Sequence, residues 1–177
     1  RIVAVAEVDG KQYLVKVFIG RYSGRYANRE VVGAAAIEDA GVLTASLEWR
    51  ALKKSARGHV LGFEYIPDAK NLLDVWKESE NDEQRFGLIS KVVPALAALH
   101  EGGVVQNDIH PENFLFRSGL IYTIDGGDVT RYDRGSLGPR KSLDNISLFF
   151  AQFHARYDHL VFEWLEQYRQ LRAWPVD

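Results

Sequence analysis

Short apolar runs, each ended by turn residues, follow one another in residues 104–128 of this 177-residue chain, VVQNDIHPENFLFRSGLIYTIDGGD. Two of the runs cover residues 114–116 and 120–124, and residues 117–119 (Arg-Ser-Gly) separate them. Apolar runs bounded by Gly, Asn and Asp are typical of strands, and a loop of about three residues that contains Gly joins such strands into a hairpin. The pattern therefore predicts a hairpin whose outer ends lie close together.

Polar residues stand at those outer ends. Asn113 precedes the first strand of the hairpin, Asp125 follows the second, and Asp108 stands on the loop before Asn113. In phosphoryl transfer, one carboxylate orients a hydroxyl nucleophile, while an amide and a second carboxylate hold Mg²⁺ on the phosphates of a nucleotide. The spacing predicts a site for this chemistry. Asp and Asn are also common in turns, so the surrounding sequence has to decide between the two interpretations.

A second hairpin is predicted upstream, and it carries a lysine. Residues 2–7 and 12–18 are strand-like, and Asp9-Gly10 between them is a strong hairpin signal. Lys16 lies in the second strand between apolar neighbours. A lone strand lysine usually points to solvent, but kinases place a lysine on such a strand to bind the α- and β-phosphates.

A helix that could carry a partner for this lysine follows. Residues 27–40 have a helical pattern that ends at Gly41. Kinases use a helix glutamate to hold the phosphate-binding ammonium in place. Glu30 lies near the predicted helix start and is the preferred partner of Lys16, while Glu38, about two turns further along, competes for the role.

Together these segments resemble a known superfamily. Val-Lys-Val-Phe, Asn-Arg-Glu, Gln-Asn-Asp-Ile-His-Pro-Glu-Asn-Phe-Leu-Phe and Ile-Asp-Gly-Gly-Asp are similar to motifs of protein-kinase-like proteins. Within that superfamily, the chain most resembles the heptose and Kdo kinases of the lipopolysaccharide core in Gram-negative bacteria. The resemblance implies an α+β, two-lobed protein-kinase-like fold. Residues 1–66 would form a small β-rich N-lobe, truncated at its start and without the glycine-rich strand, and residues 67–177 a helical C-lobe.

The resemblance also implies a role for each motif residue. Lys16 would contact the nucleotide phosphates and Glu30 would pair with Lys16. Asp108 would be the catalytic base in the C-lobe, and Asn113 and Asp125 would be the ligands of Mg²⁺.

Residues 63–66 follow an apolar strand and precede Pro67, as an interlobe hinge does in this superfamily. The backbone carbonyl of Glu64 and the backbone amide of Ile66 would then face the adenine of ATP. An ordinary buried strand end would show the same sequence pattern.

Several departures from protein kinases bear on the acceptor. Gln-Asn stands before Asp108 in place of His-Arg, and Asp125 is followed by Gly-Gly instead of Phe-Gly. No Ala-Pro-Glu follows, and only residues 126–140 separate Asp125 from the next helical pattern, which leaves little room for a protein substrate. His110 lies where aminoglycoside and choline kinases carry a histidine that braces the loop. These features favour a small-molecule or glycan hydroxyl as acceptor.

Helical patterns are predicted for residues 71–78, 83–100 (with Asp82 as cap), 142–157 and 160–173. The aromatic residues of the last two patterns are expected in the core: Phe149, Phe150, Phe153, Phe162, Trp164 and Tyr168.

Composition narrows the choice of partners. The net charge of −2 gives no general attraction to nucleic acid, the absence of cysteine fits a reducing compartment, and no apolar run approaches the length of a membrane span. The sequence therefore predicts an ATP- and Mg²⁺-dependent kinase of a sugar hydroxyl, in the lipopolysaccharide core or another sugar acceptor. It would have no nucleic-acid partner and would be cytoplasmic, either free or peripheral on the inner face of the inner membrane. The alternatives are another small-molecule kinase, of the aminoglycoside or choline type, and a pseudokinase that binds without turnover.

Overall fold

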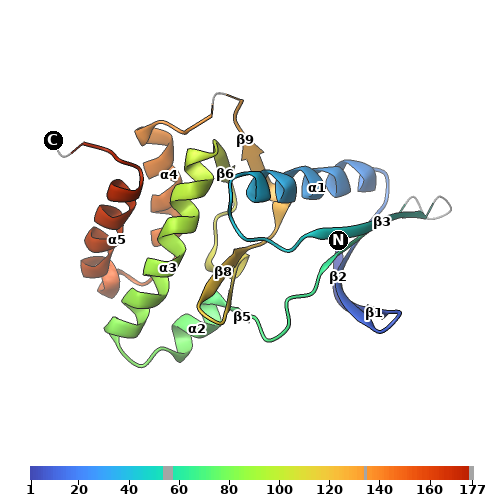
Figure 1. Ribbon diagram of the computed structural model, residues 1–177, viewed down its shortest axis with the longest axis horizontal. Coiled ribbons are helices and arrows are strands. Elements are labelled where there is room, and N and C mark those ends of the chain that lie inside the picture. Colours follow the sequence, from blue (N-terminus) through green and yellow to red (C-terminus); the bar gives the residue numbers. More distant parts are fainter. Residues whose placement is uncertain (54–57, 134, 176–177) are drawn as a thin grey trace.

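A computed structural model describes residues 1–53, 58–133 and 135–175 of the chain. It has an α+β, two-lobed, protein-kinase-like fold: a small antiparallel sheet with one long helix beside it, and a second part built mostly of helices (Figure 1). This is the fold class that the sequence predicts. None of the helices in the described part of the chain is long and apolar enough to cross a membrane.

The sheet of the first lobe has the strand order β1-β2-β4-β3, and all its neighbours are antiparallel. Its strands are β1 (Ile2–Val8), β2 (Lys11–Ile19), β3 (Leu47–Lys53) and β4 (Gly58–Glu64). The predicted hairpin of β1 and β2 is confirmed. Asp9 and Gly10 have φ angles of 52° and 76°, the left-handed conformations that a two-residue hairpin turn requires.

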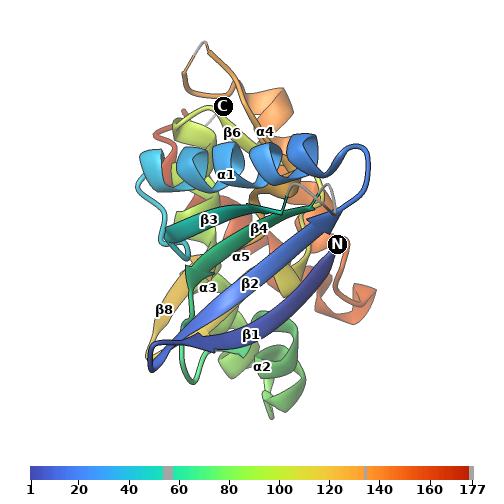
Figure 2. The same cartoon turned by 90° about the vertical axis from the view of Figure 1, so that its right-hand side faces the viewer.

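Helix α1 (Ser23–Asp39) lies across one side of this sheet (Figure 2). It begins four residues before the predicted start at residue 27, because the chain turns at Gly20 (φ 102°) and the Ser23 amide donates to the Gly20 carbonyl at 3.1 Å. The helix ends as predicted before Gly41, whose φ of 75° is left-handed. Early initiation extends the helix beside the end of the lysine strand.

The second lobe contains most of the helices and two small sheets. The helices are α2 (Leu72–Glu78), α3 (Asp82–Glu101), α4 (Pro139–Phe150) and α5 (Asp158–Leu171), with short 3₁₀ turns η2 (Pro111–Asn113), η3 (Gly126–Asp128) and η4 (Ala155–Tyr157). One sheet has the order β5-β7-β8, and the other pairs β6 with β9; these strands are β5 (Lys70–Asn71), β6 (Val104–Gln106), β7 (Phe114–Arg117), β8 (Leu120–Thr123) and β9 (Val129–Arg131). The predicted hairpin around residues 117–119 is thus confirmed as β7 and β8.

Helix boundaries in the second lobe also differ from the prediction. Asn81, rather than Asp82, caps α3: its side chain accepts a hydrogen bond from the Gln84 amide at 2.9 Å. The predicted helix over residues 142–157 is shorter and starts earlier, because Pro139 suits the first turn of α4. The chain then passes through η4 before α5 begins at Asp158.

Helix α3 continues through Pro94, a residue type that usually kinks or ends a helix. A proline inside a helix has no amide hydrogen for the carbonyl four residues earlier, which here is that of Ser90. The side chain of Gln167 on α5 donates to this carbonyl at 2.9 Å. The contact replaces the missing bond and ties α3 to α5.

The main hydrophobic core lies between α3, α4, α5 and the β7–β8 hairpin. Of the predicted core aromatics, Phe149, Phe150, Trp164 and Tyr168 are buried, and Phe153 packs against the cluster. The prediction is wrong for Phe162, which is 77% exposed. Leu160, Trp164 and Tyr168 follow one another at four-residue spacing along the buried face of α5, so a residue at 162 points to the opposite side.

Candidate active site

Lys16 and Glu30 form a buried ion pair between the first lobe's sheet and its helix. Lys16 on β2 is 7% exposed, Glu30 on α1 is 1% exposed, and the Lys16 ammonium donates a hydrogen bond to Glu30 Oε1. Glu38, the competing partner in the sequence, is exposed near the end of α1. The structure therefore brings together the preferred pair.

Asp125 joins this pair from the second lobe. The Lys16 ammonium lies 3.3 Å from Asp125 Oδ1, and the amide of Gly126 donates to Glu30 Oε1 at 3.1 Å. Asp125 has a left-handed backbone with φ 67°, which turns the chain sharply from β8 into η3. One ammonium thus lies between two carboxylates that come from different lobes.

Arg1 adds a second cation to the same point. Its guanidinium donates to both oxygens of Asp125, at 2.7 and 3.1 Å, and lies 3.6 Å from Glu30 Oε2. The two carboxylates thus attract positive charge from two directions.

The electrostatics of the two carboxylates differ. Burial alone would raise the pKa of Asp125, but the hydrogen bond from Arg1 and the charge of Lys16 outweigh it and lower the pKa to about 2. Burial is also the largest influence on Glu30 and raises its pKa, against the opposing effect of Lys16. Asp125 is therefore ionised at neutral pH, as a cation ligand must be.

The backbones of α1 and η3 touch at two glycines. A Cβ atom on Gly33 would lie 1.9 Å from the carbonyl oxygen of Gly126, and one on Gly126 would lie 2.4 Å from the Ala34 amide nitrogen. The sequence reasoning noted that Gly126 replaces a phenylalanine but missed Gly33. A glycine inside a strong helical pattern was the available signal, since such a residue often marks close packing.

Asp108 and Asn113 are linked on the loop that follows β6. The Asn113 side-chain amide donates to the backbone carbonyl of Asp108 at 2.7 Å, and the Asn113 carbonyl accepts from the Ile124 amide at 2.8 Å. Strand pairing thus places Asn113 next to the residue that precedes Asp125. His110 accepts a hydrogen bond from the Glu112 amide at 3.2 Å, a contact that braces the loop, as the sequence predicts.

A buried polar chain, missed by the sequence reasoning, supports this loop from below. Gln106 donates to the Ile124 carbonyl at 2.8 Å, and Asn145 on α4 donates to the Gln106 carbonyl at 2.9 Å. His100 on α3 hydrogen-bonds Asn145 Oδ1 at 3.0 Å and the Tyr168 hydroxyl on α5 at 2.6 Å. The residue before Asp125 is therefore connected to three helices.

The predicted hinge lies at the end of β4. The Glu64 amide donates to the Ser46 carbonyl at 2.8 Å, and the Glu64 side chain accepts from the Ser46 hydroxyl at 3.1 Å. Ile66 is buried against the sheet. The adenine contacts of Glu64 and Ile66 stay predictions.

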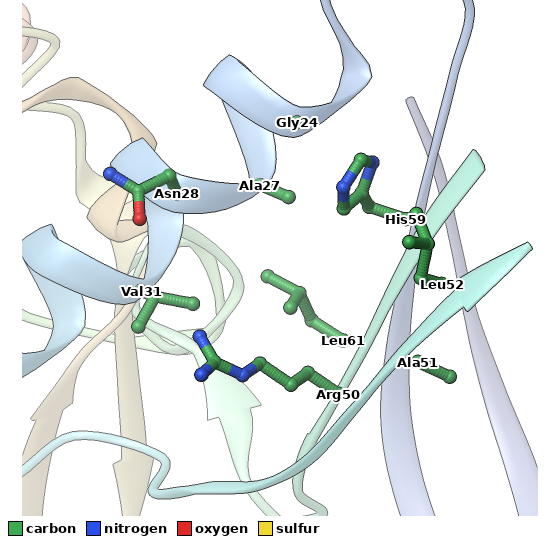
Figure 3. Close-up of a pocket in the computed structure, with 9 residues that line it drawn as sticks. All are labelled: Gly24, Ala27, Asn28, Val31, Arg50, Ala51, Leu52, His59 and Leu61. Carbon is green, nitrogen blue, oxygen red and sulfur yellow. The ribbon is translucent and has the colours of Figure 1, made fainter. Parts of the chain in front are cut away.

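Cavities lie on both sides of α1. One of about 410 Å³ adjoins the ion pairs and is lined by Arg1, Arg29, Glu30 and Asp128, among others. Another of about 410 Å³ lies between α1 and strands β3 and β4 (Figure 3). There Arg50 reaches from β3 toward Val31 on α1, and none of the lining residues is Lys16, Asp108 or Asp125. The second cavity therefore does not contain the residues of the candidate site.

The donor set suits a magnesium ion with a nucleotide. Mg²⁺ in such sites takes one or two protein oxygen ligands together with waters and substrate phosphates. Asp125 offers an ionised carboxylate, and Asn113 offers its side-chain oxygen because its amide nitrogen is bonded to Asp108. No group of three or more His, Cys, Asp or Glu residues within the described ranges could hold a metal by itself. The residues thus fit a metal that arrives with phosphates.

Comparison with known proteins gives a partial match. No family model matches the chain. Over 76 residues the chain is 41% identical to the serine/threonine-protein kinase 1 of Lymantria dispar multicapsid nuclear polyhedrosis virus. The similarity is to a protein kinase. The match covers 41% of this chain and only 27% of the viral kinase. Together with the fold, it supports a protein-kinase-like relationship. It gives no support to a lipopolysaccharide core or sugar acceptor.

Proposed function

We propose that this chain is the catalytic part of an ATP- and Mg²⁺-dependent kinase that phosphorylates an alcohol group. The arrangement of Lys16 between Glu30 and Asp125 carries the proposal. A buried ammonium held by a helix carboxylate, beside an ionised aspartate on a second lobe, is the arrangement that phosphoryl transfer from ATP requires.

Each residue then has a task. The Lys16 ammonium would bind the phosphates and offset the charge that develops on them. Asn113 and Asp125 would hold Mg²⁺, which supplies charge stabilisation on the phosphate oxygens. Asp108 would orient the acceptor hydroxyl and take its proton as the oxygen bonds to the γ-phosphorus and the bond to the ADP oxygen breaks. The products are ADP and a phosphate monoester.

The proposal extends to the domain organisation. Residues 1–66 would act as the N-lobe and residues 67–177 as the C-lobe, with ATP bound between them. The adenine would contact the Glu64 carbonyl and the Ile66 amide, next to Phe63, which lies below the Lys16 ammonium at 5.4 Å.

For the acceptor we favour a sugar hydroxyl of the lipopolysaccharide core, met at the inner face of the inner membrane. The short connection from η3 through β9 to α4 favours an acceptor that is not a polypeptide, because it offers little surface for one. The choice of a sugar rests on the resemblance of the sequence motifs to the heptose and Kdo kinases. A protein serine or threonine hydroxyl is the second candidate, and the name of the viral relative supports it.

Phosphate transfer from labelled ATP tests the proposal. The full-length protein is incubated with Mg²⁺ and, separately, with dephosphorylated lipopolysaccharide core, small alcohols such as an aminoglycoside or choline, and a protein substrate. We expect transfer to the core acceptor that Asp108→Asn abolishes and Asp74→Asn, on exposed α2 surface, leaves unchanged. Transfer to another acceptor would replace the sugar assignment. Nucleotide binding without transfer to any acceptor would indicate a pseudokinase.

A further inference from the structure

The contact between Gly33 and Gly126 has a consequence for the two carboxylates beside it. We propose that these glycines are positioning residues, which hold the helix of Glu30 and the turn of Asp125 together as one unit around Lys16. The inference rests on the proposed function insofar as Asp125 is taken to bind Mg²⁺. Neither glycine would touch a substrate.

The contact is close from both sides. A Cβ on Gly33 would meet the Gly126 carbonyl oxygen at 1.9 Å, its carbonyl carbon at 2.6 Å and its Cα at 2.8 Å. A Cβ on Gly126 would meet the Ala34 amide nitrogen at 2.4 Å and the Glu30 carbonyl oxygen at 2.5 Å. All of these atoms are backbone atoms, so no side-chain rotation relieves the overlap, and only separation of α1 from η3 makes room.

The helical conformation at position 33 does not favour glycine. Glycine inside a helix is less favourable than alanine because it loses more backbone freedom. Gly33 has helical backbone and lies well within α1, so conformation does not require glycine there. The approach of Gly126 is the feature of this structure that excludes a side chain.

The contact couples the two carboxylates. Glu30 lies one turn before Gly33, and its Oε1 accepts from both the Lys16 ammonium and the Gly126 amide. Asp125 precedes Gly126 and lies 3.3 Å from the same ammonium. Where protein kinases carry phenylalanine after this aspartate, the present chain has no room for any side chain. The turn that bears Asp125 therefore follows α1 when α1 moves.

The test measures ATP affinity by calorimetry with Mg²⁺ and with EDTA, because the ratio of the two reports the metal ligand. Wild type is compared with Gly33→Ala, Gly126→Ala and Asp125→Asn, and with Gly87→Ala on α3, whose added Cβ would meet nothing within 4 Å. For Gly33→Ala and Gly126→Ala, we expect the ratio of ATP affinity with Mg²⁺ to ATP affinity in EDTA to fall about 10- to 100-fold, as it does when residues behind the metal ligands are changed. Affinity in EDTA should change little, and Gly87→Ala should match wild type.

The proposal would be overturned if folded Gly33→Ala and Gly126→Ala gained as much ATP affinity from Mg²⁺ as wild type does. An equal loss of affinity with and without Mg²⁺ would also overturn it, since that is the signature of general damage to the fold. Gly127→Ala provides a milder variant, because its Cβ would meet only side-chain atoms: Glu30 Oε2 at 3.0 Å, Asp125 Oδ1 at 3.6 Å and a guanidinium nitrogen of Arg1 at 4.0 Å. It should lose part of the gain, and if the other two variants do not fold, an unchanged gain here counts against the proposal.

These outcomes are separate from failure of the proposed function. If wild type shows no Mg²⁺ gain, or Asp125→Asn retains it, the assignment of Asp125 as metal ligand is wrong. If wild type and Asp125→Asn behave as expected and the glycine variants do not, only the positioning role is wrong.

Discussion

Lowering the pH should destabilise this protein through His100. The side chain is 1% exposed, and burial lowers its pKa from 6.5 to about 4, with a further contribution from the charge of Arg172. Arg172 donates to the Tyr168 hydroxyl at 2.7 Å, which leaves that hydroxyl to donate to His100 Nδ1. A neutral ring that donates from Nε2 to Asn145 satisfies every group, and a second ring proton would face an already occupied hydroxyl.

The sign and size of the effect follow from proton linkage. Between pH 6.5 and 4 the unfolded chain binds a proton at this position and the folded chain does not, so stability falls as the pH falls. One pH unit of difference between the two pKa values is worth about 1.4 kcal/mol, so the full effect is on the order of 3 kcal/mol. About 2 kcal/mol should be lost by pH 5.

Urea unfolding at pH 7.5, 6 and 5 measures this slope. Wild type should lose about 2 kcal/mol across the series, or about 4 to 8 °C in thermal midpoint for a chain of this size. His100→Gln should be less stable at pH 7.5 but lose much less on acidification. His159→Gln, at a histidine whose side chain is 58% exposed and lies 3.4 Å from Asp82, is the control variant for loss of a surface histidine.

The difference between variants isolates His100 from other groups. The raised pKa of Glu30 acts with opposite sign, since its contribution is lost as pH rises, and the low pKa of Asp125 acts only below about pH 4. Equal slopes in wild type and His100→Gln would refute the reasoning.

Three further predictions concern the site, the core and a turn. Lys16→Met should lower kcat about 100- to 1,000-fold, because the phosphates lose a preorganised charge. An unchanged kcat in steady-state kinetics, with the acceptor that the transfer assay identifies, would contradict this. Phe114→Ala, at a fully buried ring of the main core, should lower the free energy of unfolding in urea by about 3 to 5 kcal/mol. A loss below about 1 kcal/mol would contradict this and show that neighbouring side chains fill the cavity. Gly10→Ala, at φ 76°, should cost about 1 to 2 kcal/mol. Gly87→Ala, inside α3 with helical backbone and open space, should be neutral or slightly stabilising. A similar cost for the two variants would count against the turn argument.

Local features of the fold were predictable from the sequence. Asp9-Gly10 and Ser118-Gly119 adopt the positive φ angles that short hairpin turns need, so each hairpin was readable from a few adjacent residues. The strand pairing of the second hairpin then brings Asn113 to the residue before Asp125, as the spacing implied.

Contacts between distant segments were not predictable in the same way. The approach of Gly33 to Gly126 depends on how α1 meets the other lobe. The hydrogen bonds that connect Gln106, Asn145 and His100 could not be predicted from the residue types alone. Phe162 was wrongly predicted to be buried, because an aromatic residue is buried only on the helix face that packs on the core. Which face of α5 packs inward depends on the neighbouring elements.

The first strand of the sheet has a consequence for handling the protein. Within the described ranges β1 pairs only with β2, so one edge of it is open, and Ile2, Val3, Val5 and Val8 are exposed along it. Sheet edges with apolar side chains are templates on which another chain can add a strand. A polypeptide of residues 1–177 alone would present this edge to other copies, and light scattering would detect edge-to-edge association as a particle size that grows with protein concentration.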